Sequence, residues 1–90
     1  MSAHYFVYVI QNNIGRFYIG LSDGLEKRVT QHNNNESTWT RGKGPWLLVW
    51  SKGPMTLSEA RKLERHLKQQ KGGNGFFQAT GLPRTSEKHS

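Results

Sequence analysis

Hydrophobic residues near the start of the chain fall in two short β-type runs. The first is Tyr5–Ile10 and the second is Arg16–Gly20, and the Gln11–Gly15 segment between them has the composition of a turn. This pattern predicts an antiparallel hairpin over residues 5–21. Both faces of the first run are apolar, so we expect the sheet to be covered on both sides.

Two tyrosines are predicted to share one face of this hairpin. If Gln11 lies opposite Gly15 around a three-residue loop, Tyr8 falls opposite Tyr18. Partners across a strand pair point to the same side of the sheet. The two phenols are therefore either an ordinary aromatic pair or the start of an active site.

A first helix is predicted over residues 24–33. Leu25 and Val29 form an apolar stripe at i and i+4, and Asp23 with Glu26 resembles a capping box. The asparagines that follow suit the end of a helix and the beginning of a loop.

A second helix is predicted over residues 57–70, after a loop at 36–45 and a short apolar strand at Trp46–Trp50. Thr56 and Glu59 form a capping box. The residues that recur at helical spacing are Leu57, Ala60, Leu63 and Leu67. The order β-β-α-β-α predicts an α+β fold within the broad α/β class, a small three-stranded antiparallel sheet flanked by helices.

The end of the chain is predicted to be partly irregular. The glycine-rich segment Gly72–Gly75 is interpreted as a helix stop, and the rings of Phe76 and Phe77 are expected to pack on the core. We expect one domain over residues 1–82 and a polar, flexible tail over residues 83–90.

Composition narrows the class of partner. The chain has 90 residues, with 13 Lys and Arg against 6 Asp and Glu, which gives a formal net charge of +7. Such an excess favours nucleic acid as the partner, although a solvated lysine-rich face has the same composition. With no cysteine, disulfides, thiolate zinc sites and cysteine nucleophiles are excluded. The start has no signal-peptide pattern, so we expect a cytoplasmic protein without a membrane partner.

Glu64 interrupts the apolar stripe of the second helix. At 100° per residue it lies between Leu57 and Ala60. A carboxylate on the packing side of a helix has to be exposed at the rim, ion-paired or bound to a metal. An ion pair with Lys68 or Arg61 is the simpler interpretation, and a metal ligand is the functional one.

On the first helix, Arg28 and His32 are four residues apart and share a face. Arginine matches the oxygens of a phosphate, and histidine moves protons near neutral pH, so the pair suits a phosphate site. For His32 taken alone, a solvated position beside the last helical carbonyls is the favoured interpretation.

The loop before the third strand interleaves aromatic residues with cations. This composition fits contacts with backbone phosphates together with base stacking. We expect nucleic-acid contacts from Trp39, Thr40, Arg41 and Lys43, with Trp39 as the stacking residue. Trp46, beside an apolar strand, is expected in the core.

Taken together, these motifs resemble the GIY-YIG nuclease superfamily. They are Val7–Val9, Tyr18–Gly20, Arg28, His32 and a helical Glu64. The resemblance covers about residues 5–78 and is closest to the small stand-alone branch that is similar to the nuclease subunit of structure-specific resolvases. The first motif reads Val-Tyr-Val where the family name has Gly-Ile-Tyr, and the stretch around Asn74 also differs.

The resemblance implies hydrolysis of a DNA phosphodiester with one divalent ion, Mg²⁺ or Mn²⁺, possible substrates being branched or damaged DNA in repair or recombination. It implies that Tyr8 acts as general base or orients the water, assisted by Tyr18. It further implies that Glu64 holds the metal, Arg28 stabilises the transition state, and His32 transfers a proton or binds phosphate. By our physical reasoning, Arg28 and the metal should lower the pKa of Tyr8.

Two other functions stay open at this point. One is a nucleic-acid binding module on the same scaffold that does not cut. The other is a protein-interaction domain in which the tyrosine pair is structural. The small surface of a ninety-residue domain also leaves room for a protein partner or a homodimer in substrate selection.

Overall fold

The computed structural model describes residues 3–36, 40–71 and 73–82. These residues form an α+β fold with three strands and three helices. The elements are β1 (Tyr5–Asn12), β2 (Phe17–Ser22), α1 (Leu25–Asn33), β3 (Trp46–Met55), α2 (Leu57–Gln70) and α3 (Asn74–Thr80). The tail at 83–90 lies outside the described residues.

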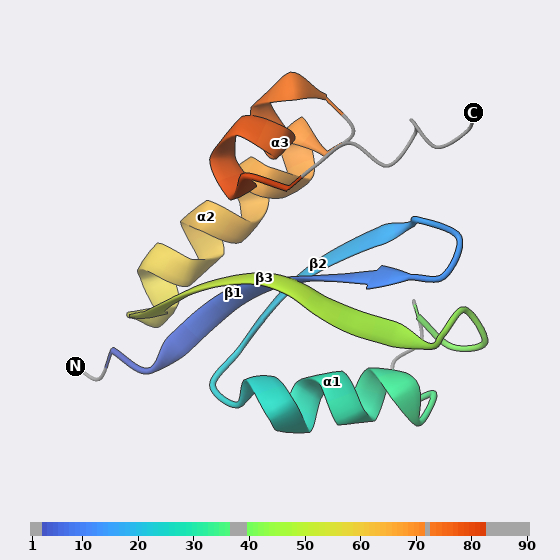
Figure 1. Ribbon diagram of the computed structural model, residues 1–90. Helices are drawn as coiled ribbons and strands as arrows, with labels where there is room; N and C mark the ends of the chain where they lie inside the picture. Colours follow the sequence, from blue (N-terminus) through green and yellow to red (C-terminus); the bar gives the residue numbers. More distant parts are fainter. Residues whose placement is uncertain (1–2, 37–39, 72, 83–90) are drawn as a thin grey trace.

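The three strands form one antiparallel sheet in the order β2-β1-β3. Helix α1 lies on one side of this sheet, and α2 and α3 lie on the other (Figure 1). Coverage on both sides confirms the expectation from the apolar faces of β1. Strand β3 continues to Met55 and is therefore longer than the predicted Trp46–Trp50 segment.

Side chains alternate along β1 between two hydrophobic cores. Val7 and Val9 belong to the core under α2 and α3, which also contains Phe17, Ile19, Ala60, Leu67 and Phe76. Tyr8 and Ile10 belong to the core on the α1 side, together with Trp46, and Leu25 and Val29 pack against it. Tyr8 and its surroundings are thus built into the packing between α1 and the sheet.

The predicted register of the hairpin is wrong by two residues. Tyr8 pairs with Gly20, and Tyr18 pairs with Ile10. The reason is Gly15, whose φ of 86° belongs to the left-handed region that glycine favours, so this residue lies inside the turn and not opposite Gln11. A shift by two preserves the face of every side chain, and Tyr8 and Tyr18 still share one side of the sheet.

The two helix starts differ in how well the sequence predicted them. Helix α2 has the expected capping box, with Thr56 and Glu59 bonded to each other's backbone. The capping box expected at Asp23 is absent: the N-cap of α1 is Gly24, without a side-chain bond. The backbone N–H of Gly24 is instead bonded to the hydroxyl of Ser22 at 3.0 Å.

A third helix, α3, was not predicted and begins inside the glycine-rich segment Gly72–Gly75, which was interpreted only as a helix stop. It has only seven residues and carries a glycine at its second position, so its sequence has little helical signal. Phe76 is fully buried and its ring lies 5.3 Å from that of Phe17. The expectation that the phenylalanine rings pack on the core is therefore confirmed.

The end of α1 is fixed to the start of β3. The side-chain amide of Asn33 donates to the carbonyl of Trp46 at 3.0 Å, and its oxygen accepts from the N–H of Trp46 at 2.7 Å. These two hydrogen bonds hold the last turn of α1, which carries His32, against the sheet. Trp46 is 2% exposed, as its expected place in the core requires.

Candidate active site

The phenol of Tyr8 lies over Gly20 on the edge strand β2. A Cβ atom at Gly20 would lie 2.6 Å from Cζ of Tyr8 and would also collide with its hydroxyl. Glycine inside a strand often marks such a close approach. Gly20 therefore has a physical reason to be glycine, which is that it leaves room for a fully packed tyrosine ring.

A chain of three side chains links β1, α1 and the loop before β3. Tyr8 Oη lies 2.8 Å from Nε2 of His32, and Nδ1 of His32 lies 2.7 Å from Oγ1 of Thr40. His32 and Thr40 are completely buried and Tyr8 is 1% exposed. The favoured sequence interpretation of His32 as a solvated helix-end residue is wrong, because the loop brings Thr40 over the imidazole.

Arg28 joins this chain from the preceding turn of α1. Its Nε donates to Tyr8 Oη at 3.4 Å, and its Nη1 donates to Gln31 Oε1 at 2.8 Å. A guanidinium can only donate hydrogen bonds, so the phenol oxygen accepts from Arg28 and its own proton is available to His32. The structure thus brings Tyr8, Arg28 and His32 together as the sequence predicted.

Tyr18 lies beside the same histidine. Its ring centre is 5.0 Å from that of His32 and 6.5 Å from that of Trp46. Tyr18 is only partly buried, unlike Tyr8. The two tyrosines therefore differ: Tyr8 is enclosed and hydrogen-bonded, and Tyr18 is open to a surface pocket.

Burial raises the pKa of Tyr8 to about 12. Arg28 acts in the opposite direction, through its hydrogen bond and its charge, and the nearby Tyr18 and Glu64 raise the pKa slightly further. The expectation that Arg28 lowers this pKa is right in direction, but desolvation is larger. In this state Tyr8 is a neutral phenol at neutral pH.

His32 is held neutral as well. Burial, and then the charge of Arg28, lower its pKa from 6.5 to about 4. A neutral imidazole has one nitrogen that donates and one that accepts, which suits a position between two hydroxyl groups. The Tyr8–His32–Thr40 chain can therefore shift a proton without any change in its net charge.

This burial predicts a loss of stability in mild acid. The pKa of His32 is about 4 in the folded protein and about 6.5 in the unfolded chain, so the unfolded chain binds more protons between these values. The free energy of unfolding should then fall as the pH is lowered through this window, by up to about 3 kcal/mol.

Urea denaturation of the wild type and of His32→Gln at pH 7 and at about pH 4.5 checks this expectation. The wild type should lose more stability than the variant over this interval, because only the wild type has the imidazole. An equal loss in both proteins would contradict the assignment of a neutral, buried His32.

Glu64 lies on α2, across the sheet from α1. Its carboxylate accepts from Nζ of Lys68 at 3.1 Å, and its side chain is 22% exposed. The ion pair with Lys68 confirms the simpler of the two interpretations of this residue. The charge of this carboxylate adds to the rise in the pKa of Tyr8, after the effects of burial and of Tyr18.

Among the residues expected to form the active site, only Glu64 has a carboxylate that could bind a metal ion. The described residues contain no group of three or more His, Cys, Asp or Glu side chains that could hold a metal. Mg²⁺ needs no such cage, because it retains several waters and binds through one or two carboxylates and the phosphates of its substrate. A partly exposed Glu64 fits this kind of site.

The residues expected to contact nucleic acid differ in their exposure and contacts. Trp39 lies outside the described residues. Arg41 and Lys43 are exposed on the loop, which is compatible with phosphate contacts. Thr40 is fully buried and bonded to His32, so its observed part is to position the imidazole. Direct contact with nucleic acid stays a prediction for this loop.

The structure gives Gly20 and Thr40 specific roles that the sequence analysis did not assign. Gly20 had a signal in the sequence, as a glycine within a predicted strand. No feature of the sequence indicated that Thr40 contacts His32, because loop residues show no periodicity from which such a contact could be inferred.

Comparison with known proteins shows the family of this chain. Residues 4–76 match the protein family described as the GIY-YIG catalytic domain. The match spans well over half of the chain, and the chain therefore belongs to this family, as its motifs suggested.

Relatives with known sequences agree with this membership. A UPF0213 protein of Aeromonas hydrophila is 36% identical over 70 residues, which cover 77% of this chain and 52% of that protein. Another, from Vibrio campbellii, is 38% identical over 64 residues, with 70% and 62% covered. This chain thus spans about half to two thirds of the length of these relatives, whose names specify no activity.

A solution NMR structure of a UPF0213 protein from Bacillus halodurans is also similar. The match has a TM-score of 0.46 and 27% sequence identity, and covers 72% of this chain and 70% of that one. Separately, no helix within the described ranges is long and apolar enough to cross a membrane.

Proposed function

We propose that this protein is a metal-dependent endonuclease that hydrolyses DNA phosphodiester bonds, with branched or damaged DNA in repair or recombination as its substrate class. The observation that carries the proposal is the position of Tyr8 Oη, which is bonded to both His32 Nε2 and Arg28 Nε. A buried phenol with a proton acceptor on one side and a cation on the other is arranged for proton transfer beside an anion.

The proton path follows these contacts. Tyr8 Oη takes a proton from the attacking water while its own proton passes to Nε2 of His32, and Thr40 Oγ1 accepts from Nδ1. The water oxygen forms the new bond to phosphorus, and the leaving oxygen of the DNA departs with its electron pair. Because both groups are neutral at rest, Tyr8 relays a proton and does not act as a free phenolate.

Arg28 would stabilise the transferring phosphoryl group. Donors placed where negative charge develops commonly contribute about 10²-fold or more in rate. The guanidinium is already held by Gln31 and Tyr8, so its orientation costs little when the substrate binds. Tyr18, open to the surface beside His32, would contact the phosphate from the other side.

One divalent ion, Mg²⁺ or Mn²⁺, would be held by Glu64, water and the phosphate of the substrate. When bound, such an ion polarises phosphoryl oxygens and stabilises the charge on the leaving oxygen. Glu64 would leave its ion pair with Lys68 to bind this ion. The loss would be small, because an exposed i,i+4 ion pair contributes only about 0.3 to 0.5 kcal/mol to stability.

The test is a titration of Mg²⁺ and of Mn²⁺ over a panel of hairpin, flap, junction and single-stranded DNA. We expect cleavage that requires the ion and is fastest on one branched member of the panel. Binding that weakens with salt but is never followed by cleavage would contradict the proposal and favour the non-catalytic binding module.

A further inference from the structure

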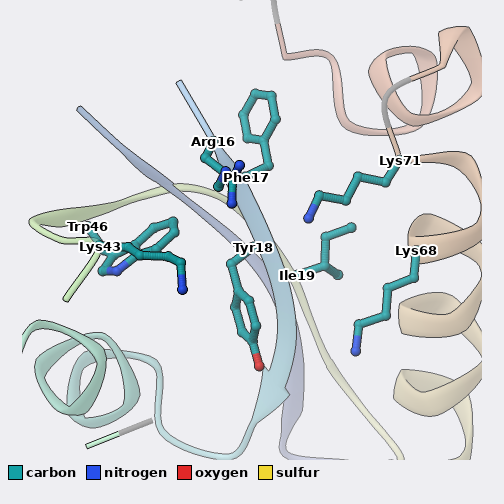
Figure 2. Close-up of a pocket in the computed structure, with 8 residues that line it drawn as sticks. All are labelled: Arg16, Phe17, Tyr18, Ile19, Lys43, Trp46, Lys68 and Lys71. Carbon is teal, nitrogen blue, oxygen red and sulfur yellow. The ribbon is translucent and has the colours of Figure 1, made fainter. Parts of the chain in front are cut away.

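A basic pocket lies beside the candidate active site. It has a volume of about 520 Å³ and is bordered by β2, the loop before β3 and the last turns of α2 (Figure 2). Four of the residues that line it are cations, Arg16, Lys43, Lys68 and Lys71. Tyr18 also lines it, so the pocket is continuous with the site of Tyr8 and His32.

A buried asparagine holds the backbone at two of the pocket cations. Asn12 is 7% exposed, and its Oδ1 accepts from the backbone N–H of Arg16 at 2.8 Å. Its Nδ2 donates to the backbone carbonyl of Lys43 at 3.0 Å. One side chain thus fixes the backbone positions of two cations that come from separate segments, the hairpin turn and the loop.

The opposite wall is formed by α2. Lys68 and Lys71 are three residues apart and extend from this helix toward β2 (Figure 2). Among the described residues that line the pocket, none is acidic. Glu64 pairs with Lys68 at its margin.

The cations repel one another in the absence of a ligand. The pKa of Lys71 is lowered, first by burial and then by the charges of Arg16 and Lys68. Mutual repulsion among clustered positive charges costs stability, and an anion between Arg16, Lys68 and Lys71 would relieve it. The arrangement favours a ligand with more than one negative charge.

We propose that this pocket binds the backbone phosphates of a single nucleic-acid strand, next to the phosphate that is cut. This inference rests on the proposed function, which puts the phosphate that is cut beside Tyr18, a residue that also lines the pocket. A pocket of about 520 Å³ falls in the size range that encloses a small molecule, so it accepts a short piece of one strand and not a double helix.

The test compares two double variants with the same change of charge. Arg16→Gln with Lys71→Gln removes two pocket cations and leaves Lys68 and Glu64 intact. Lys52→Gln with Lys62→Gln removes two cations that line another part of the surface, near the start of α2. Fluorescence anisotropy with a labelled single-stranded oligonucleotide, and with its duplex, is measured against salt in EDTA, where no metal-dependent cleavage occurs.

The pocket variant should bind the single strand about tenfold more weakly at low salt, and its slope of log affinity against log salt should be smaller by about 1.4. Its affinity for the duplex should change much less. The control variant should keep its single-strand affinity within about twofold. Equal losses in both variants, or an equal loss for duplex and single strand, would overturn the proposal.

Thermal unfolding separates binding from folding. Because the removed cations repel each other, the pocket variant should be at least as stable as the wild type. A lower Tm with weakened binding would indicate a structural role and contradict the proposal.

If wild-type protein cuts DNA and the pocket variant binds single strands normally, only the pocket assignment fails. If nothing is cut but the pocket variant loses single-strand binding, only the nuclease proposal fails.

Discussion

Replacing Glu64 with glutamine is expected to lower metal-dependent DNA cleavage by about 10²-fold to 10³-fold. Glutamine preserves the shape of the side chain but removes the charge that would hold a divalent ion. The fold should survive, because the side chain is partly exposed and an i,i+4 ion pair with Lys68 contributes only about 0.3 to 0.5 kcal/mol. DNA affinity in EDTA should be largely retained.

The matched control for this substitution is Glu59→Gln on the same helix. Glu59 serves the capping box of α2, and glutamine is also accepted at this position. Cleavage by Glu59→Gln should therefore equal that of the wild type. Rates of Glu64→Gln as high as those of this control would remove Glu64 from the metal site.

Gly20→Ala is expected to damage both stability and activity. The added methyl group would overlap the hydroxyl and Cζ of Tyr8, whose ring is buried. Overpacking of this kind typically costs about 1 to 3 kcal/mol. Any shift that relieves the overlap also moves the phenol away from His32, so cleavage should fall even where the protein is folded.

Denaturation curves and cleavage rates of Gly20→Ala and Gly73→Ala check this prediction together. A Cβ at Gly73 would meet only the carbonyl oxygen of Gln70, at an ordinary 3.5 Å. Gly73→Ala should therefore remain active. A Gly20→Ala protein with wild-type stability and rate would show that the phenol does not need its observed place.

The predicted register of the hairpin was wrong, but the prediction that Tyr8 and Tyr18 share one face of the sheet was right, because the error was an even number of residues. Side chains alternate with a period of two, so any even shift preserves the face. The register itself depends on which residue of the turn takes a left-handed conformation. That residue is Gly15, and composition alone did not determine its place in the turn.

The burial of His32 could not be read from its helix. Its spacing from Arg28 correctly placed the two on one face, but the packing partner, Thr40, comes from an irregular loop that carries no periodic signal. Contacts between a helix and such a loop depend on the whole fold. Helix α3 was missed for a related reason, since its burial through Phe76 outweighs a weak local preference.

The chemistry of Tyr8 was predicted in direction and not in size. The charge of Arg28 does lower its pKa, but the depth of burial, which only the structure reveals, raises it to about 12. The expectation for Arg28 is therefore right in direction, and the proposed function uses a proton relay through His32 because Tyr8 is a neutral phenol at rest.

The central claim is that the buried phenol of Tyr8 takes part in chemistry, and Tyr8→Phe tests it most directly. Loss of the hydroxyl removes the contacts to His32 and Arg28 while the ring stays packed over Gly20. Tyr5→Phe on the same strand, on the opposite face, is the control.

Single-turnover cleavage of the preferred DNA substrate at saturating Mg²⁺ or Mn²⁺ is the decisive measurement. Tyr8→Phe should cut about 10²-fold to 10⁴-fold more slowly than the wild type with DNA affinity retained, as expected for loss of a proton-transfer group. Tyr5→Phe should cut at the wild-type rate. Equal rates for Tyr8→Phe and the wild type would contradict the account, because the phenol would then be only a packed part of the core.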